Sequence, residues 1–116
     1  MEIRFKNKVA FITGAAGGIG YAAARMFAEA GASVVMADLD SRVTDRAKEL
    51  EAEGHNAIGI RCDVSDEAQV KAAVEKAVAV FGKLDIAYNN VGIHAAVRED
   101  LAETEGWDFD RVISVN

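Results

Sequence analysis

The sequence lacks a second cysteine, an excess of basic residues and an uncharged run long enough to cross a membrane. Because Cys62 is alone, an internal disulfide and a cysteine-based metal site are excluded, and a reducing cytoplasm is expected. The 13 Lys and Arg residues against 19 Asp and Glu residues give a net charge of −6, which opposes binding to nucleic acid or an anionic membrane. The uncharged residues 9–24 fall short of the roughly 20 residues that a membrane helix needs.

The remaining composition is that of an ordinary folded domain. Hydrophobic residues make up 51% and charged residues 28% of the 116 positions, so the chain can bury one layered core. We therefore expect residues 1–116 to form a single domain. Four short apolar runs follow one another at intervals of 24 to 26 residues, at positions 9–12, 34–37, 58–61 and 84–88.

Segments with helical spacing separate these apolar runs. Strands that are apolar on both sides and alternate with helices predict an α/β fold, a Rossmann-type doubly wound parallel sheet with helices on both faces. If the chain reverses direction after the third strand, the strand order is 3-2-1-4, truncated to about four strands with an exposed edge on the fourth. The loops at Gly14, Asp38 and Asn89 would then share one rim, where ligands of such folds bind.

Residues typical of helix ends flank the predicted helices. Left-handed C-terminal caps are expected at Gly31, Gly54 and Gly82. Side-chain oxygens for the first turns are expected from Asp40 or Ser41 and from Ser65. The mixed charges of residues 42–53 indicate a solvated helix face. A last helix is predicted after Thr104, with helical spacing between Phe109, Val112, Ile113 and Asn116.

A glycine-rich loop from Thr13 to Gly20 joins the first predicted strand to the first predicted helix. Glycine allows backbone angles closed to other residues and lets a phosphate approach main-chain N–H groups, while the helix N-terminus adds partial positive charge. Asp38 ends the second strand, where a carboxylate can accept hydrogen bonds from ribose hydroxyls and repel a 2′-phosphate, so NAD is favoured. Arg42 is close enough in sequence to leave NADP open, and an Asp38 that only caps a turn is the alternative.

Five segments in order resemble the short-chain dehydrogenase/reductase family. They are the glycine loop, Asp38, the Cys62-Asp63-Val64 step, the segment from Asn89 to Gly92, and the stretch from Trp107 to Asn116. The resemblance covers essentially the whole chain. It implies an oxidoreductase that binds a nicotinamide dinucleotide and acts on an alcohol or carbonyl group. It also implies that the chain is the N-terminal, cofactor-binding part of a longer family fold and that it works as a homo-oligomer.

Carried over by position, the resemblance implies a role for each matching residue. The pyrophosphate would be lined by Gly14, Gly18, Ile19 and Gly20, the ribose held by Asp38, and the adenine bordered by Asp63 and Val64. Asn90 and Gly92 would run beside the cofactor, and Asn116 would help to organise a proton-relay water in the active site. Val91 is bulkier than the alanine that is usual in the family.

The family's catalytic Ser and its Tyr-x-x-x-Lys pair have no counterpart in this sequence. Tyr21 is followed four residues on by Arg25, and Tyr88 has no Lys at that interval, so both tyrosines are expected to be packing residues. Without the tyrosine's proton transfer, the chain alone is predicted to bind cofactor and not to turn over. The alternatives are a non-catalytic nucleotide-binding or regulatory module and a site completed by a separate polypeptide. His55 and His94 do not have metal-ligand spacing, and no metal is expected.

Overall fold

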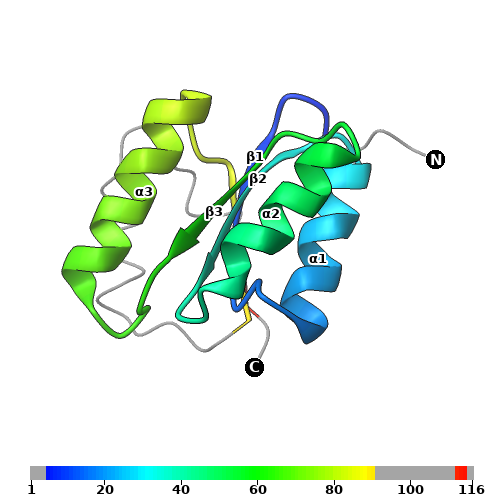
Figure 1. The fold of residues 1–116 in the computed structure, drawn as a ribbon. Coiled ribbons are helices and arrows are strands. Elements are labelled where there is room, and N and C mark those ends of the chain that lie inside the picture. Colours follow the sequence, from blue (N-terminus) through cyan, green and yellow to red (C-terminus); the bar gives the residue numbers. More distant parts are fainter. Residues whose placement is uncertain (1–4, 91–111, 115–116) are drawn as a thin grey trace.

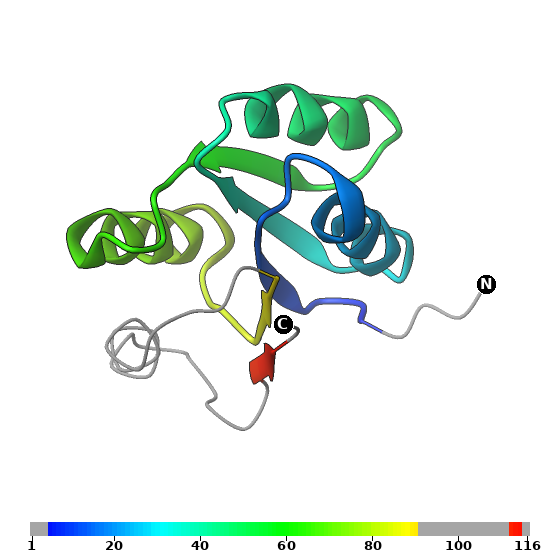
Figure 2. The same cartoon turned by 90° about the horizontal axis from the view of Figure 1, so that it is seen from below.

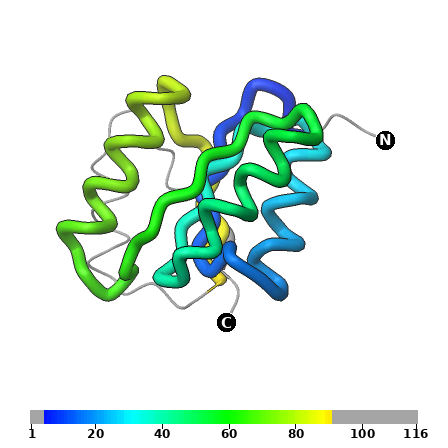
Figure 3. The backbone as a smooth tube through the Cα atoms, in the orientation of Figure 1, coloured from blue at the N-terminus to red at the C-terminus, as the bar shows by residue number. Residues whose placement is uncertain are grey.

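The computed structural model describes residues 5–90 and 112–114, which form one sheet and three helices (Figure 1). In chain order the elements are β1 (Val9–Thr13), α1 (Gly18–Glu29), β2 (Ser33–Asp38), α2 (Arg42–Ala52), β3 (Ala57–Arg61), α3 (Glu67–Phe81), β4 (Ile86–Asn89) and β5 (Val112–Ser114). The backbone runs from each of the first three strands into a helix and back to the sheet (Figure 3). Within residues 5–90, no helix has the length and hydrophobicity needed to span a membrane.

The sheet is parallel throughout, with the strand order β3-β2-β1-β4-β5. The predicted order 3-2-1-4 is therefore confirmed for the first four strands. β1 lies at the centre, where Phe11 is level with Val35 of β2 and Ala87 of β4. Because the chain goes from β1 to one side and then returns to β4 on the other, loops after β1 and β4 diverge at this position, where ligands of open α/β sheets bind.

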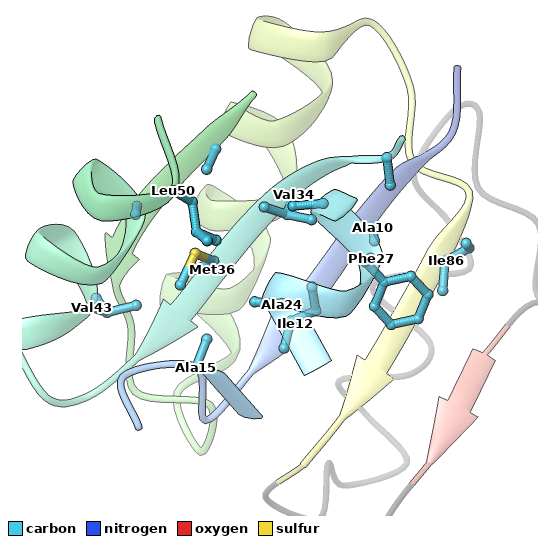
Figure 4. Packing of buried hydrophobic residues seen from close by; sticks show 14 of the residues in the cluster. Ala10, Ile12, Ala15, Ala24, Phe27, Val34, Met36, Val43, Leu50 and Ile86 are labelled. Atoms are coloured by element: carbon cyan, nitrogen blue, oxygen red, sulfur yellow. The ribbon is translucent and has the colours of Figure 1, made fainter. Parts of the chain in front are cut away.

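Helices cover both faces of the sheet, α1 and α2 on one face and α3 on the other (Figure 2). Alternate residues of β1 divide between the two cores: Ala10 and Ile12 pack on the side of α1 and α2, and Val9 and Phe11 on the side of α3. Figure 4 shows the first of these cores, with Phe27 packed beside the central strands. Since both faces are buried, the central strands need apolar residues at successive positions, as the sequence has them.

The helix ends agree with the sequence except at the start of α3. Gly31, Gly54 and Gly82 have φ angles of 101°, 96° and 83°, which confirms their left-handed conformation. Before α2, the Asp40 carboxylate accepts the Arg42 N–H at 2.9 Å, whereas Ser41 makes no side-chain cap bond. The cap predicted at Ser65 is wrong. Asp66 caps α3 by accepting the N–H groups of Ala68 and Gln69, whereas the Ser65 hydroxyl donates to Asp63 at 2.6 Å.

The helix predicted over the last residues is wrong for positions 112–114, which form β5. Val112, Ile113 and Ser114 pair in parallel with Ala87, Tyr88 and Asn89. β-branched residues favour a strand, and the outer edge of β4 offers N–H and C=O groups that need partners. The predicted exposed edge on β4 is consequently covered by a fifth strand. Phe109 and Asn116, the other residues of the predicted helix, lie outside the described residues.

Candidate functional site

The carboxyl ends of β1, β2 and β4 meet at one end of the sheet through hydrogen bonds between their loops. The Ala16 N–H donates to Asp38 Oδ2 at 2.9 Å, which joins the loop after β1 to the end of β2. The Thr13 hydroxyl donates to Asn89 Oδ1 at 3.2 Å and accepts the Asn90 N–H at 3.0 Å, which joins β1 to β4. The three loops expected to share one rim are thus in direct contact.

Thr13, the first residue of the glycine loop, belongs to this site, although no role for its side chain was predicted from the sequence. It is 1% exposed at the end of an otherwise apolar strand. A buried hydroxyl needs partners, and Thr13 finds them on both Asn89 and Asn90. The signal that could have found it is this polar residue at the boundary of a buried apolar run. Asn90 also approaches the Gly14 carbonyl with its amide nitrogen, at 3.5 Å.

The glycine loop uses three of its glycines in different ways. Gly14 and Gly18 have φ angles of 64° and 58°, which side chains rarely allow. Gly20 has no Cβ for another reason: a Cβ placed there would lie 1.8 Å from the Gly14 carbonyl oxygen. Gly17 has extended backbone angles that any residue can adopt, and a Cβ there would meet nothing within 4 Å.

The N–H groups of this loop divide into bonded and open ones. The Ala15 N–H donates to the Ala37 carbonyl at 3.2 Å, and the Ala16 N–H donates to Asp38. Among residues 5–90 and 112–114, the N–H groups of Gly18, Ile19 and Gly20 donate to no acceptor. These three begin α1, where unpaired N–H groups and the helix dipole together favour an anion. No acidic side chain stands in the first turn to compete for the position.

Asp38 holds two parts of the rim with its half-buried carboxylate. Its Oδ2 accepts the Ala16 N–H, and its Oδ1 accepts the Asp40 N–H at 2.9 Å. The turn-capping role is therefore present, as the alternative reading of this residue expected. A carboxylate has about four lone-pair sites, so both oxygens keep capacity for further donors.

The next acidic residue, Asp40, is engaged by Arg42. Arg42 donates from Nε to Asp40 Oδ2 at 2.9 Å, and its Nη2 lies 2.7 Å from the same oxygen. Hydrogen bonding to this guanidinium lowers the pKa of Asp40 below its ordinary value. The cationic group closest in sequence to Asp38 is consequently paired with another carboxylate.

A cavity of about 140 Å³ opens beside Asp38. Its walls come from the ends of β1, β2 and β3, through Gly14, Asp38, Leu39, Cys62, Asp63 and Val64. Leu39 is 57% exposed and was not singled out from the sequence, although an apolar residue directly after a strand-ending aspartate could have indicated it. Cys62 is buried, and burial raises the pKa of its thiol, which keeps it protonated and unreactive.

Asp63 and Val64 present one acceptor and one donor to this region. Asp63 Oδ1 accepts both the N–H and the hydroxyl of Ser65, at 2.9 and 2.6 Å, and these bonds lower the pKa of Asp63. In the part of the chain that the structure describes, Asp63 Oδ2 and the Val64 N–H have no partner. A planar heterocycle with an exocyclic amino group could use both at once.

The tyrosines lie away from this cavity. Tyr21 packs against the core of α1 and α2, and its hydroxyl donates to Glu49 at 2.9 Å. Tyr88 packs edge-on against Phe27, with 6.0 Å between the ring centres. Their assignment as packing residues is confirmed. Gly92, His94 and Asn116 lie outside the described residues, within which no group of three or more His, Cys, Asp or Glu side chains could hold a metal ion.

Comparison with protein families matches residues 8–116 to the family described as short chain dehydrogenase. The chain belongs to this family. It is 45% identical over 114 residues to borneol dehydrogenase, mitochondrial, of Lavandula x intermedia, covering 97% of this chain and 42% of that protein. It is 43% identical over 114 residues to secoisolariciresinol dehydrogenase of Forsythia intermedia, covering 97% of this chain and 40% of that protein. The chain thus spans about two fifths of the length of these relatives.

Solved structures give the same family. A hydroxysteroid dehydrogenase from Escherichia coli superposes with a TM-score of 0.74 at 40% identity, over 78% of this chain and 39% of that chain. A short chain dehydrogenase/reductase from Burkholderia phymatum, in complex with NAD, superposes with a TM-score of 0.73 at 42% identity, over 77% of this chain and 32% of that one. At these identities the similarity extends beyond the fold to the sequence that forms it.

Proposed function

We propose that this chain is the NAD(H)-binding portion of a short-chain dehydrogenase/reductase that acts on an alcohol or carbonyl group. One observation carries the proposal: three open N–H groups at the start of α1 lie in a loop that is hydrogen-bonded to a strand-ending aspartate. The open N–H groups suit a diphosphate, and the aspartate suits a ribose. The dehydrogenase names of the relatives, and the NAD complex of one structural relative, support this reading.

The residues present suit such a cofactor, because, within the described residues, unpaired N–H groups and carboxylates with free acceptor sites lie at one end of the sheet. We infer that Gly14, Gly18, Ile19 and Gly20 surround the diphosphate, with the N–H groups of the last three as donors. Asp38 would accept from the adenosine ribose, and Asp63 with Val64 would accept from and donate to the adenine. Asn90 and Gly92 would follow the cofactor towards the nicotinamide, which supplies hydride transfer when bound.

Electrostatics supports NAD over NADP. A 2′-phosphate would bring about two negative charges next to Asp38, and like charges at close range are unfavourable. Arg42 could offset them, but its guanidinium is hydrogen-bonded to Asp40 in this structure. The pairing with Asp40 leaves this guanidinium less able to offset the charge of a 2′-phosphate.

We further propose that the chain alone does not complete the reaction. The proton transfer that accompanies hydride transfer needs an acid or base at the substrate oxygen. The Tyr21 hydroxyl is bound to Glu49, and Tyr88 is packed on Phe27, so neither stands in for the family's catalytic tyrosine. We also propose that Asn116 takes part in the active site, that the protein is cytoplasmic and that it forms homo-oligomers. Sedimentation velocity at micromolar concentrations tests the last of these.

Calorimetric titration with NADH and NADPH tests the cofactor assignment. The wild type should bind NADH more tightly than NADPH, and Asp38→Ala should weaken NADH binding by about tenfold, the effect of losing one charged hydrogen-bond acceptor. Glu51→Ala, which removes an exposed carboxylate near the far end of α2, is the control and should bind NADH like the wild type. Tight binding of NADPH together with absent binding of NADH would overturn the assignment.

A further inference from the structure

Arg46 connects α2 to the glycine loop. Its Nε donates to the Ala16 carbonyl oxygen at 3.1 Å, across 30 positions of sequence. Its Nη1 donates to Glu49 at 2.9 Å, one turn along the same helix. The guanidinium also lies 5.4 Å from the centre of the Tyr21 ring, within cation–π range. These three contacts leave the half-buried side chain little freedom to turn away from the loop.

A second set of contacts fixes the partners of Arg46. The Tyr21 hydroxyl donates to the other oxygen of Glu49 at 2.9 Å and accepts from Arg25 at 3.0 Å. Arg25 in turn binds both carboxylate oxygens of Glu53, at 2.7 and 2.9 Å. An isolated exposed ion pair orients little, but here each charged group is held by the next, from Glu53 through to the loop. We call Tyr21, Arg25, Arg46, Glu49 and Glu53 the interhelix network.

Because of the geometry of the peptide group, the contact with the Ala16 carbonyl also fixes the direction of the Gly17 N–H. The Ala16 carbonyl and the Gly17 N–H belong to one peptide group, and no described peptide bond is cis. In a trans peptide these two bonds point in opposite directions. Holding the carbonyl towards α2 therefore aims the Gly17 N–H away from α2. Within the described residues this N–H donates to no acceptor.

The peptide group before it is fixed as well, because the Ala16 N–H is bound by Asp38. Ala16 is thus held from both sides, by the Asp38 carboxylate that accepts its N–H and by the Arg46 guanidinium that donates to its carbonyl. Gly17 itself has no side chain to restrict its backbone, and it precedes the open N–H groups of Gly18 to Gly20. A loop with this freedom would otherwise sample several orientations of those groups.

We propose that Arg46 is a positioning residue for cofactor binding, which orients the Ala16–Gly17 peptide so that the Gly17 N–H adds a donor for the diphosphate. The inference rests on the proposed function and deepens it. Arg46 acts from the opposite side of the loop and does not itself touch the cofactor. Removing the Arg46 guanidinium should therefore weaken the binding of ligands that carry the diphosphate and leave the binding of a ligand without it unchanged.

Arg46→Met is the test variant, because methionine keeps the length and helix preference of the side chain but cannot donate. Affinity for NADH and ADP-ribose should fall about tenfold, the effect of losing one well-placed hydrogen bond, while adenosine affinity stays within about twofold. Arg42→Ala removes a guanidinium from the same helix that contacts Asp40 and not the loop, so it should not weaken NADH binding. Should Arg46→Met fail to fold, Glu49→Gln loosens the guanidinium without altering Arg46 and should show the same selective loss.

The outcomes separate the inference from the proposed function. If the wild type binds NADH and Arg46→Met binds ADP-ribose as tightly as the wild type does, the inference alone is overturned. An equal loss of adenosine and ADP-ribose affinity would also overturn it, because that pattern indicates a general structural role. A wild type that binds neither NADH nor ADP-ribose would overturn the proposed function and the inference with it.

Discussion

Replacing Gly20 by alanine tests how closely the glycine loop is packed against the start of α1. The new Cβ would lie 1.8 Å from the Gly14 carbonyl oxygen and 2.5 Å from its carbon. An ordinary carbon–oxygen contact is roughly 3.3 Å, so the two backbone segments would have to separate by about 1.5 Å. Neither is free to do so, since Asn90 also contacts the Gly14 carbonyl and would lie 3.0 Å from the Cβ.

Two opposing effects decide the size of the change. Inside a helix, alanine is about 1 kcal/mol more favourable than glycine. Overpacking costs about 1–3 kcal/mol, and the upper end is expected here because the clash is with backbone and not with a flexible side chain. The net loss should be about 2 kcal/mol, which lowers the melting temperature of a chain of this size by roughly 8–12 °C. NADH affinity should fall too, because the open N–H groups shift with the loop.

Thermal unfolding followed by circular dichroism measures this change, and Gly17→Ala is the matched control. Gly17 is extended, with open space around a Cβ, so its variant should unfold within about 0.5 kcal/mol of the wild type. A Gly20→Ala protein that melts at or above the wild-type temperature would refute the reasoning. Helix preference would then outweigh packing, and the close approach of Gly14 to α1 would be wrong.

Three further predictions concern charge and reactivity. Asp40→Asn should release Arg42 and raise NADPH affinity about fivefold; the gain should vanish in the double variant with Arg42→Ala, and its persistence there would exclude Arg42 as the cause. Hydrogen bonding to Arg25 lowers the pKa of Glu53 below its ordinary value of 4.5, so this pair adds stability above that pH and loses it as the pH falls. The free energy of unfolding should accordingly decrease less steeply with falling pH in Glu53→Gln than in the wild type. The same pH dependence in both proteins would show that the pair adds no stability. Cys62 is 1% exposed and its pKa is raised, so iodoacetamide should react about a hundredfold more slowly with the folded than with the urea-unfolded chain; equal rates would mean that the strand end opens readily.

The arrangement of the first four strands could be predicted because its signals are local. Each strand is a short run of apolar residues, and Gly31, Gly54 and Gly82 each mark the return from a helix by a backbone angle that other residues avoid. Alternating strands and helices with right-handed crossovers then leave few ways to order the sheet. The loop contacts around Asp38 follow from that order, although the cofactor roles of the rim residues remain predictions.

The fifth strand could not be predicted for a physical reason. Val112 and Ile113 fit a helix at i+3 and i+4 from Phe109. They fit a strand equally well, since a three-residue run has too little length to show a period. What decides the outcome is the free edge of β4, which exists only after the sheet has formed. The sequence pattern around these residues carries no information about that edge.

The contact of Arg46 with the glycine loop could not be predicted either, for a related reason. Residues 42–53 have the mixed charges of a solvated helix face. Arg46 and Glu49 are indeed partly exposed to solvent. Their positions one turn apart also place them towards Tyr21 of α1, which no pattern within α2 could indicate. Glycines that bind phosphate are visible in sequence because they act through their own backbone, whereas Arg46 acts on a peptide group 30 positions away. If the Arg46 inference holds, substitutions confined to the recognised motif would underestimate how much of the chain determines cofactor affinity.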